Sequence, residues 1–300
     1  MNGTQMSTVL ITGCSTGLGV AMSVKAAQAG HTVVATMRNL DKRGQIDAAL
    51  TEAGVTADVR MLDVTDQTSI DACIAGVLND HGRIDVLINN AGAAQLRTTE
   101  QASDAELQWI TDVNYYGVVR MTKAVLPGMR ETRSGRIINI SSVGGLVGQP
   151  FNDFYCAAKF AVEGYTESLA SYVGPAFGIH FSLIEPGGIN TAFADNALAH
   201  FAQSGGMLDD EYKPLLEAYI GGAQSRAESS DDPGSFAYQS ADAVADIVMD
   251  VMSAGQPPLR TRTSDWSEAF TARKTQADPT GLKQRDDVVE RFLGTYDFGS

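Results

Sequence analysis

The chain has 300 residues, of which 44% are hydrophobic, and it carries a formal net charge of −14 at pH 7. This acidic balance argues against binding to nucleic acid or to an anionic membrane surface, because either partner needs a basic face. No apolar run approaches the ~18–20 residues that span a bilayer, and the first residues lack the basic start of a signal peptide. The cysteines Cys14, Cys73 and Cys156 show no metal-ligand spacing, so we expect no metal site and a reducing, cytoplasmic location.

A glycine-rich turn follows the first expected strand. Residues 9–12 are a short apolar run, residues 13–19 read GCSTGLG, and a helical stretch then extends to Gly30. Strand, glycine turn and helix are the context that a dinucleotide fingerprint requires. The glycines let the backbone approach a pyrophosphate, and the helix N-terminus supplies unpaired N–H groups and a positive dipole end. The turn therefore predicts a dinucleotide site.

The second expected strand, residues 31–36, ends at Met37-Arg38 without an acidic residue. A carboxylate here would accept a hydrogen bond from the adenosine ribose of NAD, whereas an arginine can pair with the 2′-phosphate of NADP. The alternative is that Arg38 is a solvated arginine in a loop. We expect NADP(H) to be preferred over NAD(H).

Two further strands end in polar or small residues. Residues 58–62 are followed by Asp63-Val64, and Asp63 can either reach the adenine amino group or cap the helix that begins near Gln67. Residues 84–88 are followed by NNAG at 89–92. Small residues and side-chain amides at the end of a strand fit a turn that packs close to a cofactor.

A long helical stretch is expected over residues 103–133, with Asn114 in its middle. An amide is a poor helix former, and such a local conflict often marks a functional site. The alternative is an interhelical hydrogen bond. Pro127 is expected to kink or break this helix.

Residues 155–159 read YCAAK, so Tyr155 and Lys159 project from one face of the helix expected over 153–177. A cation beside a phenol favours the phenolate and lowers the pKa from its usual ~10. A tyrosine tuned in this way can exchange a proton with a carbonyl or alcohol oxygen. Ser142, at the end of the run IINISS, can hold the same oxygen by a hydrogen bond. A YxxxK pair alone is a common chance pattern, so its weight comes from the other motifs.

Six expected strands alternate with helices up to residue 191, which predicts an α/β fold with a parallel, doubly wound sheet. Ser142, residues 89–92 and residues 186–191 all follow strand ends, at the edge where such sheets bind ligands. Residues 192–237 have no regular pattern and read as a substrate lid. Beyond them we expect a helix over 241–252, an edge strand over 257–261 and helix potential near 286–293. The chain is therefore expected to be a single domain over 1–300, with a core at 8–191, a lid at 192–237 and C-terminal elements at 238–300.

Taken together, these motifs resemble those of the short-chain dehydrogenase/reductases, in order and spacing, across residues 8–191. The resemblance implies a Rossmann-type fold, a catalytic tetrad of Asn114, Ser142, Tyr155 and Lys159, and a nicotinamide amide held by Ile189 and Thr191. Residues 142–170 are most similar to the branch of 17β-hydroxysteroid dehydrogenase type 1 and the retinol dehydrogenases. The expected cofactor-binding residues are Thr12, Gly13, Ser15, Thr16, Gly17, Leu18, Gly19, Arg38, Asp63, Val64, Asn90, Ala91, Gly92, Tyr155, Lys159, Pro186, Gly187, Ile189 and Thr191.

The expected function is an NADP(H)-dependent oxidoreductase that interconverts a ketone and a secondary alcohol on a bulky apolar substrate that is steroid-like, terpenoid or aryl. Two alternatives are a nucleotide-sugar epimerase or dehydratase, whose glycine turn usually has a different spacing, and a redox sensor, which commonly lacks the tyrosine or the lysine. The family resemblance also implies a homodimer or homotetramer built on the helices that begin near Ser103 and Asp153.

Overall fold

The computed structural model describes residues 6–228, 238–283 and 286. Within them, a parallel sheet of seven strands has the order β3-β2-β1-β4-β5-β6-β9. Its strands are β1 (Thr8–Ile11), β2 (Thr32–Met37), β3 (Asp58–Met61), β4 (Val86–Asn89), β5 (Gly135–Ile140), β6 (Ile179–Glu185) and β9 (Arg260–Arg262). The order reverses between β1 and β4, which is the switch point of a doubly wound sheet. The Rossmann-like α/β fold predicted from the sequence is confirmed.

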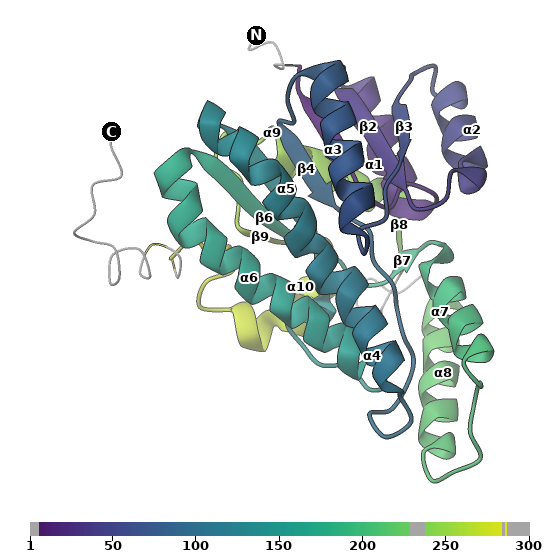
Figure 1. The fold of residues 1–300 in the computed structure, drawn as a ribbon. Helices are drawn as coiled ribbons and strands as arrows, with labels where there is room; N and C mark the ends of the chain where they lie inside the picture. The colour runs from purple at the N-terminus through teal and green to yellow at the C-terminus, as the bar shows by residue number, and fades with distance from the viewer. Residues whose placement is uncertain (1–5, 229–237, 284–285, 287–300) are drawn as a thin grey trace.

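Helices cover both faces of the sheet (Figure 1). They are α1 (Gly17–Gln28), α2 (Gly44–Glu52), α3 (Gln67–His81), α4 (Asp104–Thr111), α5 (Gly117–Thr132), α6 (Asp153–Phe177), α7 (Ala192–Gln203), α8 (Lys213–Glu228), α9 (Ala241–Ser253) and α10 (Asp265–Thr275). One core packs α1, α2 and α9 against the sheet, and a second packs α3, α5 and α6 against its other face. Strands covered on both sides are apolar throughout, which explains the buried runs TVLI in β1 and VLIN in β4.

The helical stretch predicted over 103–133 is present, but its interruption is not at Pro127. Helix α5 continues through that proline to Thr132. The irregularity lies at Asp112–Tyr116, a π-helical turn that joins α4 to α5 and contains Asn114. The local conflict predicted at Asn114 therefore coincides with an irregular turn, of a kind that often lies at a functional site. Of the kink or break expected at Pro127, the break is not found.

The segment predicted to be irregular, residues 192–237, contains a helix pair, α7 and α8. Thr191 caps α7 by accepting a hydrogen bond from the Phe193 amide. Gly205 and Gly206 have φ of +105° and +62°, so these glycines form the turn after α7 and lie outside the helices. Gly221 and Gly222, by contrast, lie within α8, so this helix forms in spite of two glycines and the glycine content of the segment did not predict the helix pair.

The C-terminal elements also differ from the expectation. The edge strand β9 begins three residues later than the predicted start at 257, and α10, which was not predicted, follows it. The two-residue strands β7 (Ile189–Asn190) and β8 (Gln239–Ser240) pair with each other. The helix potential near 286–293 lies almost entirely outside the described residues. Among the described helices, none is long and apolar enough to cross a membrane.

Candidate active site

The glycine turn and the segment after β4 are joined by hydrogen bonds. The side-chain amide of Asn90 donates to the carbonyl oxygens of Thr12 and Gly13 at 2.9 and 3.1 Å. The Thr12 hydroxyl accepts from the backbone amides of Asn90 and Ala91, both at 3.0 Å. A Cβ on Gly13 would lie 2.8 Å from the Cα of Ala91, so these two segments can approach only because residue 13 is glycine.

The other two motif glycines are equally constrained. Gly17 has φ of +59°, and a Cβ there would lie 2.9 Å from the Cβ of Thr191 in the segment after β6. A Cβ on Gly19 would lie 2.3 Å from the Gly13 carbonyl oxygen. Three motifs that are far apart in the sequence therefore meet at the N-terminus of α1.

This turn fits the pyrophosphate of a dinucleotide. Thr16 makes no side-chain cap to α1, and the first turn of that helix contains no acidic residue. The first N–H groups of a helix have no partner within the helix, so here they are available to an anion, which the helix dipole also favours. Ser15 lies in the same turn, whereas the Leu18 side chain packs into the core, so it can contribute to a nucleotide site only through its backbone.

Arg38 is exposed immediately after β2 and forms no ion pair with any described residue. Asp63 does not cap α3, because Asp66 does so by accepting from the Thr68 amide. One Asp63 carboxylate oxygen instead accepts from the amide and the hydroxyl of Thr65. Its neighbour Val64 is buried, with its side chain in the core.

Ser142, Tyr155 and Lys159 lie together at the ends of β5 and α6. The Ser142 hydroxyl accepts from the Gly144 amide at 2.9 Å. It lies beside the Tyr155 ring, since a Cβ on Gly144 would be 3.3 Å from both the Ser142 hydroxyl and the Tyr155 Cε1. The Lys159 ammonium donates to the Ile140 carbonyl oxygen at 2.8 Å and lies 5.7 Å from the centre of the Tyr155 ring. The three side chains that were read from separate stretches therefore form one group.

The predicted lowering of the Tyr155 pKa is not found in this structure. Burial raises the pKa of Tyr155 to about 12, and the nearby Ser142 hydroxyl acts in the opposite direction. Burial also lowers the pKa of Lys159 to about 8, while the nearby Glu163 carboxylate works against that shift. The Lys159 charge is directed at a backbone carbonyl, so the loss of water around the phenol outweighs its influence. In this state Tyr155 is a proton donor.

Asn114 is fully buried, and its hydrogen bonds connect the π turn to the loop after β4. Its carbonyl oxygen accepts from the Ala93 amide at 3.1 Å, and its amide donates to the carbonyl oxygens of Ala93 and Ile110, both at 2.9 Å. The interhelical hydrogen bond considered from the sequence is therefore wrong, since its partner outside its own helix is a loop. A Cβ on Gly92 would lie 3.0 Å from the Asn114 carbonyl oxygen and 3.9 Å from the Lys159 ammonium.

The segment after β6 completes this edge of the sheet. The Pro186 carbonyl accepts from the Val143 amide at 3.0 Å, which joins the segment to the loop that holds Ser142. A Cβ on Gly187 would lie 3.1 Å from the Ser267 hydroxyl, so this turn packs against α10. Ile189 contacts the core beside α1 and α9. All the predicted site segments therefore reach one sheet edge, except that Leu18 and Val64 direct their side chains into the core.

Sequence reasoning missed a group of buried charges behind this site. Glu163 lies one helical turn after Lys159, and Glu185 ends β6; both are buried, together with Arg262 of β9. A signal was available for Glu163, since residues 155, 159 and 163 share one helix face and a carboxylate on a buried face is a local conflict. Nothing in the sequence alone connects it to Glu185 or to the arginines.

The comparisons with known proteins agree on the family of this chain. The sequence model of the short chain dehydrogenase family matches residues 7–200. Retinol dehydrogenase 8 of Bos taurus is 39% identical over 280 residues, covering 91% of this chain and 86% of that protein. The 17-beta-hydroxysteroid dehydrogenase type 1 of Homo sapiens is 37% identical over 263 residues, covering 86% and 77% respectively.

A solved structure shows the same agreement in three dimensions. A short-chain dehydrogenase from Streptomyces avermitilis matches with a TM-score of 0.74 and 29% identity, covering 96% of this chain and 99% of that one. The parallel, Rossmann-like sheet agrees with that relationship. The chain belongs to the short-chain dehydrogenase/reductase family and is an oxidoreductase of that family.

Proposed function

We propose that the protein is an NADP(H)-dependent oxidoreductase that interconverts a ketone and a secondary alcohol on a bulky apolar substrate. The observation that carries the proposal is the grouping of Ser142 and Tyr155, with Lys159 beside them, at the sheet edge that holds the glycine turn. The nicotinamide cofactor supplies or accepts the hydride when bound, whereas the protein provides orientation and proton transfer.

Each residue of the group has a distinct role in this proposal. Tyr155 gives a proton to the carbonyl oxygen during reduction and takes it back during oxidation. Ser142 holds the same oxygen by a hydrogen bond and keeps the phenol in place. Lys159 supplies positive charge beside the phenol, which favours the phenolate once the proton has left. Asn114 fixes the loop after β4 against the π turn, so that Gly92 remains close to Lys159.

The cofactor preference rests on Arg38. Short-chain dehydrogenases bind NAD(H) or NADP(H), and the C-terminal end of β2 is where the two are distinguished in this topology. An exposed guanidinium that no described carboxylate pairs is well suited to bind a 2′-phosphate, because charge-assisted hydrogen bonds to phosphate are among the strong ones. The turn before α1 would hold the pyrophosphate.

The apolar character of the substrate rests on the lid helices. Phe193 of α7 lies beside the Tyr155 ring, with the ring centres 6.2 Å apart. Phe193 is 40% exposed beside the proposed reacting group, and Leu198 and Leu215 elsewhere on the helix pair are 44% and 61% exposed. An apolar ligand would remove this surface from water at roughly 25 cal/mol per Å². We therefore propose a steroid-like, terpenoid or aryl ketone or alcohol.

The experiment that tests the proposal is a panel of ketones and secondary alcohols, graded in apolar size and followed at the nicotinamide absorbance with both cofactors. We expect turnover with NADPH or NADP⁺ and a kcat/KM that increases with ring number. No turnover of any ketone or alcohol with either cofactor would refute the reaction. A kcat/KM that does not rise with apolar size would refute the substrate class.

A further inference from the structure

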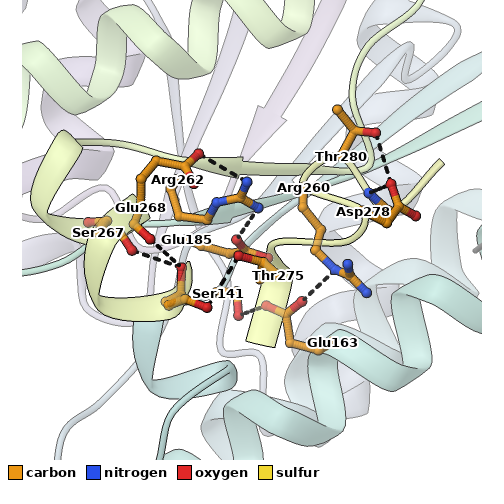
Figure 2. Close-up of polar contacts among 12 residues, drawn as sticks. Ser141, Glu163, Glu185, Arg260, Arg262, Ser267, Glu268, Thr275, Asp278 and Thr280 are labelled. Atoms are coloured by element: carbon orange, nitrogen blue, oxygen red, sulfur yellow. Dashed lines mark hydrogen bonds and ion pairs between the residues drawn. The ribbon is translucent and has the colours of Figure 1, made fainter. Parts of the chain in front are cut away.

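Behind Ser142 and Lys159, five buried or nearly buried polar side chains come together from four elements (Figure 2). They are Ser141 after β5, Glu163 on α6, Glu185 at the end of β6, and Arg260 and Arg262 on β9. The exposed fractions of Glu163 and Glu185 are 5% and 0%. None of these residues was assigned a part in the proposed reaction.

The two arginines are bound mainly by other carboxylates. Arg262 lies 3.3 Å from Glu185 and 3.0 Å from the more exposed Glu268. Arg260 pairs closely with Glu167, and its Nε lies 4.0 Å from Glu163. The charged groups that face the two buried acids are Lys159 and Glu167 from α6, Arg260 and Arg262 from β9, and Glu268 from α10.

Each of the two buried acids has one carboxylate oxygen that lacks a hydrogen-bond donor among the described residues. Glu163 Oε1 accepts a hydrogen bond from the Ser141 hydroxyl, and Glu185 Oε2 contacts Arg262. Glu163 Oε2 and Glu185 Oε1 are buried without a hydrogen-bond donor among the described residues. Both acids also flank the same residue, because the Ser141 hydroxyl binds Glu163 while the Ser141 amide donates at 2.7 Å to the carbonyl oxygen of Ile184, the residue before Glu185. Ionised carboxylates only accept, so the two buried charges repel each other unless one of the groups carries a proton.

We propose that Glu163 and Glu185 share one proton at neutral pH, and that this acid–carboxylate pair positions the Ser142 loop and keeps the charge of Lys159 uncompensated. One proton gives both oxygen atoms a hydrogen bond and removes one of two buried negative charges. The behaviour is that of two carboxyl groups that share a site, in which one pKa is strongly raised. Burial raises the pKa of both acids, and their mutual repulsion raises that of Glu163 further.

The pair connects directly to the group around Tyr155. Lys159 donates to the carbonyl of Ile140, and the next residue, Ser141, donates to Glu163 one helical turn further along α6. The residues leading to Ser142 are therefore held to α6 at two successive positions. A Cβ on Gly145 would lie 2.7 Å from the Ser141 hydroxyl and 3.0 Å from Glu163, so the loop packs closely against this contact.

The shared proton also controls the local charge. A neutral Glu163 leaves the positive charge of Lys159 free to act on Tyr155, whereas an ionised Glu163 would offset it. Glu185 immediately precedes Pro186, so the same pair joins the Ser142 loop to the segment proposed to hold the nicotinamide. The presence of the proton does not depend on the proposed function, but its effect on turnover rests on that function.

Infrared spectroscopy of the full chain without substrate tests the proton directly. At pH 7 we expect a carbonyl-stretching band of a buried carboxylic acid in the wild type, shifted in D₂O and lost as the pH is raised. The band should disappear in both E163Q and E185Q. E268Q is the matched control, since the Glu268 carboxyl is 53% exposed and contacts Arg262, as Glu185 does. The carboxylic acid band of E268Q should be the same as that of the wild type. No band in the wild type at pH 7, or a band that persists in both E163Q and E185Q, would overturn the shared proton.

Kinetics with a ketone that the enzyme accepts test the positioning role. Glutamine can accept from Ser141 and donate to Glu185, so E163Q should retain kcat within about threefold. E163L can do neither, and we expect kcat to fall by about tenfold or more, with little change in the Kd for NADPH. Wild-type kcat in a folded E163L would refute positioning even if the infrared band is present. A wild type inactive on every ketone and alcohol would instead refute the proposed function and leave the infrared result standing.

Stability provides a check that requires neither substrate nor cofactor. A carboxyl whose folded pKa is raised contributes stability that is present below its unfolded pKa and lost as the pH rises through its folded pKa. The Tm of the wild type should therefore fall as the pH rises from about 5, just above the unfolded pKa of a glutamate, to the raised folded pKa, and that of E163Q should fall less over this range. If the Tm of the wild type and the Tm of E163Q decrease equally with pH, the two acids do not titrate as a pair.

Discussion

Tyr155 is the residue on which the proposed reaction depends most, and its surroundings favour the protonated form. Burial raises its pKa to about 12, and the Ser142 hydroxyl acts in the opposite direction. A phenol in this state is ready to give a proton to a carbonyl oxygen. The same burial makes the phenol a weaker acid, so the proposed proton transfer depends on the positive charge of Lys159 to stabilise the phenolate.

Replacement of Tyr155 by phenylalanine removes only the hydroxyl. We expect kcat to fall by ~10²–10⁴-fold, the usual contribution of a general acid or base, while the Kd for NADPH measured by fluorescence stays close to that of the wild type. Y172F is the matched control on the same helix, because Tyr172 is 47% exposed. A Y155F enzyme with more than about a tenth of the wild-type kcat would count against the assignment.

Replacement of Arg38 by alanine tests the cofactor preference. Loss of a charge-assisted hydrogen bond of ~1.5–3 kcal/mol should weaken NADPH binding by about 10- to 100-fold and leave NADH binding nearly unchanged. R43A is the control, since Arg43 is also exposed after β2 but already pairs with Asp47 at 2.7 Å. The reading of Arg38 is wrong if the wild type has the higher kcat/KM with NADH.

The pH dependence of reduction should report on Lys159. The pKa of its ammonium is lowered to about 8 by burial, so its positive charge is present below pH 8 and lost above it. The kcat/KM for ketone reduction should be constant near pH 6–7 and decrease as the pH rises through about 8, in a profile measured with NADPH. K123M, which changes an exposed lysine of α5, should keep the same profile. A flat profile to pH 9.5 would contradict this role.

At the scale of elements, a buried arginine is one of the contacts that hold the helix pair α7 and α8 to the rest of the molecule. Arg97, which follows the loop after β4, is 4% exposed and donates to the carbonyl oxygen of Gly206 at 2.7 Å and to Ser204 in the turn after α7. Its guanidinium also lies over the Phe201 ring, 5.0 Å from the centre. The position of α7, and of Phe193 beside Tyr155, thus depends on this contact.

We therefore predict that R97A loosens the helix pair without removing the reacting group. The KM for a large polycyclic ketone should rise by about tenfold, whereas the KM for a small ketone should change little, as measured by steady-state kinetics with both substrates. The small ketone serves as the internal control. If both KM values change equally, or neither changes, α7 and α8 do not select the substrate.

The elements that the sequence predicted well are those with a strong local pattern. The strands β1, β2, β4, β5 and β6 follow from apolar runs, β3 follows from its alternating pattern, and several of the helices between them end at glycines. Helix α10 was missed because its sequence, DWSEAFTARKT, has no apolar stripe. The Glu163–Glu185 pair was missed for a different reason: it joins α6 to β6, and no local spacing relates residues that only the folded sheet brings together.

At the scale of the whole molecule, exposed apolar side chains support the predicted oligomer. Leu107, Tyr116, Phe160 and Tyr172, on α4, the π turn and α6, are 37–49% exposed. Helices α4 and α6 contact each other, so exposed apolar side chains on the two helices can contribute to one surface. A second copy of the chain can cover part of that surface. Sedimentation at micromolar concentration should show a dimer or tetramer of the 31.8 kDa chain. A species of 31.8 kDa alone would refute this prediction, and a Y116E/Y172E variant should dissociate if the surface is correct.

The π turn at Asp112–Tyr116 is a place where the gene can lose a single codon without disturbing the core. Each residue of an α-helix turns by about 100°, so the loss of one codon within α5 would rotate every later side chain, including the buried Val125 and Met129, away from the core. The π turn contains one residue more than a regular turn. A single-codon deletion there would yield an ordinary α-helix with its downstream phase intact. Such a deletion would leave the packing of the core unchanged but would remove the hydrogen bonds between Asn114 and Ala93. A related chain with this deletion would therefore keep the fold and lose the geometry of the site.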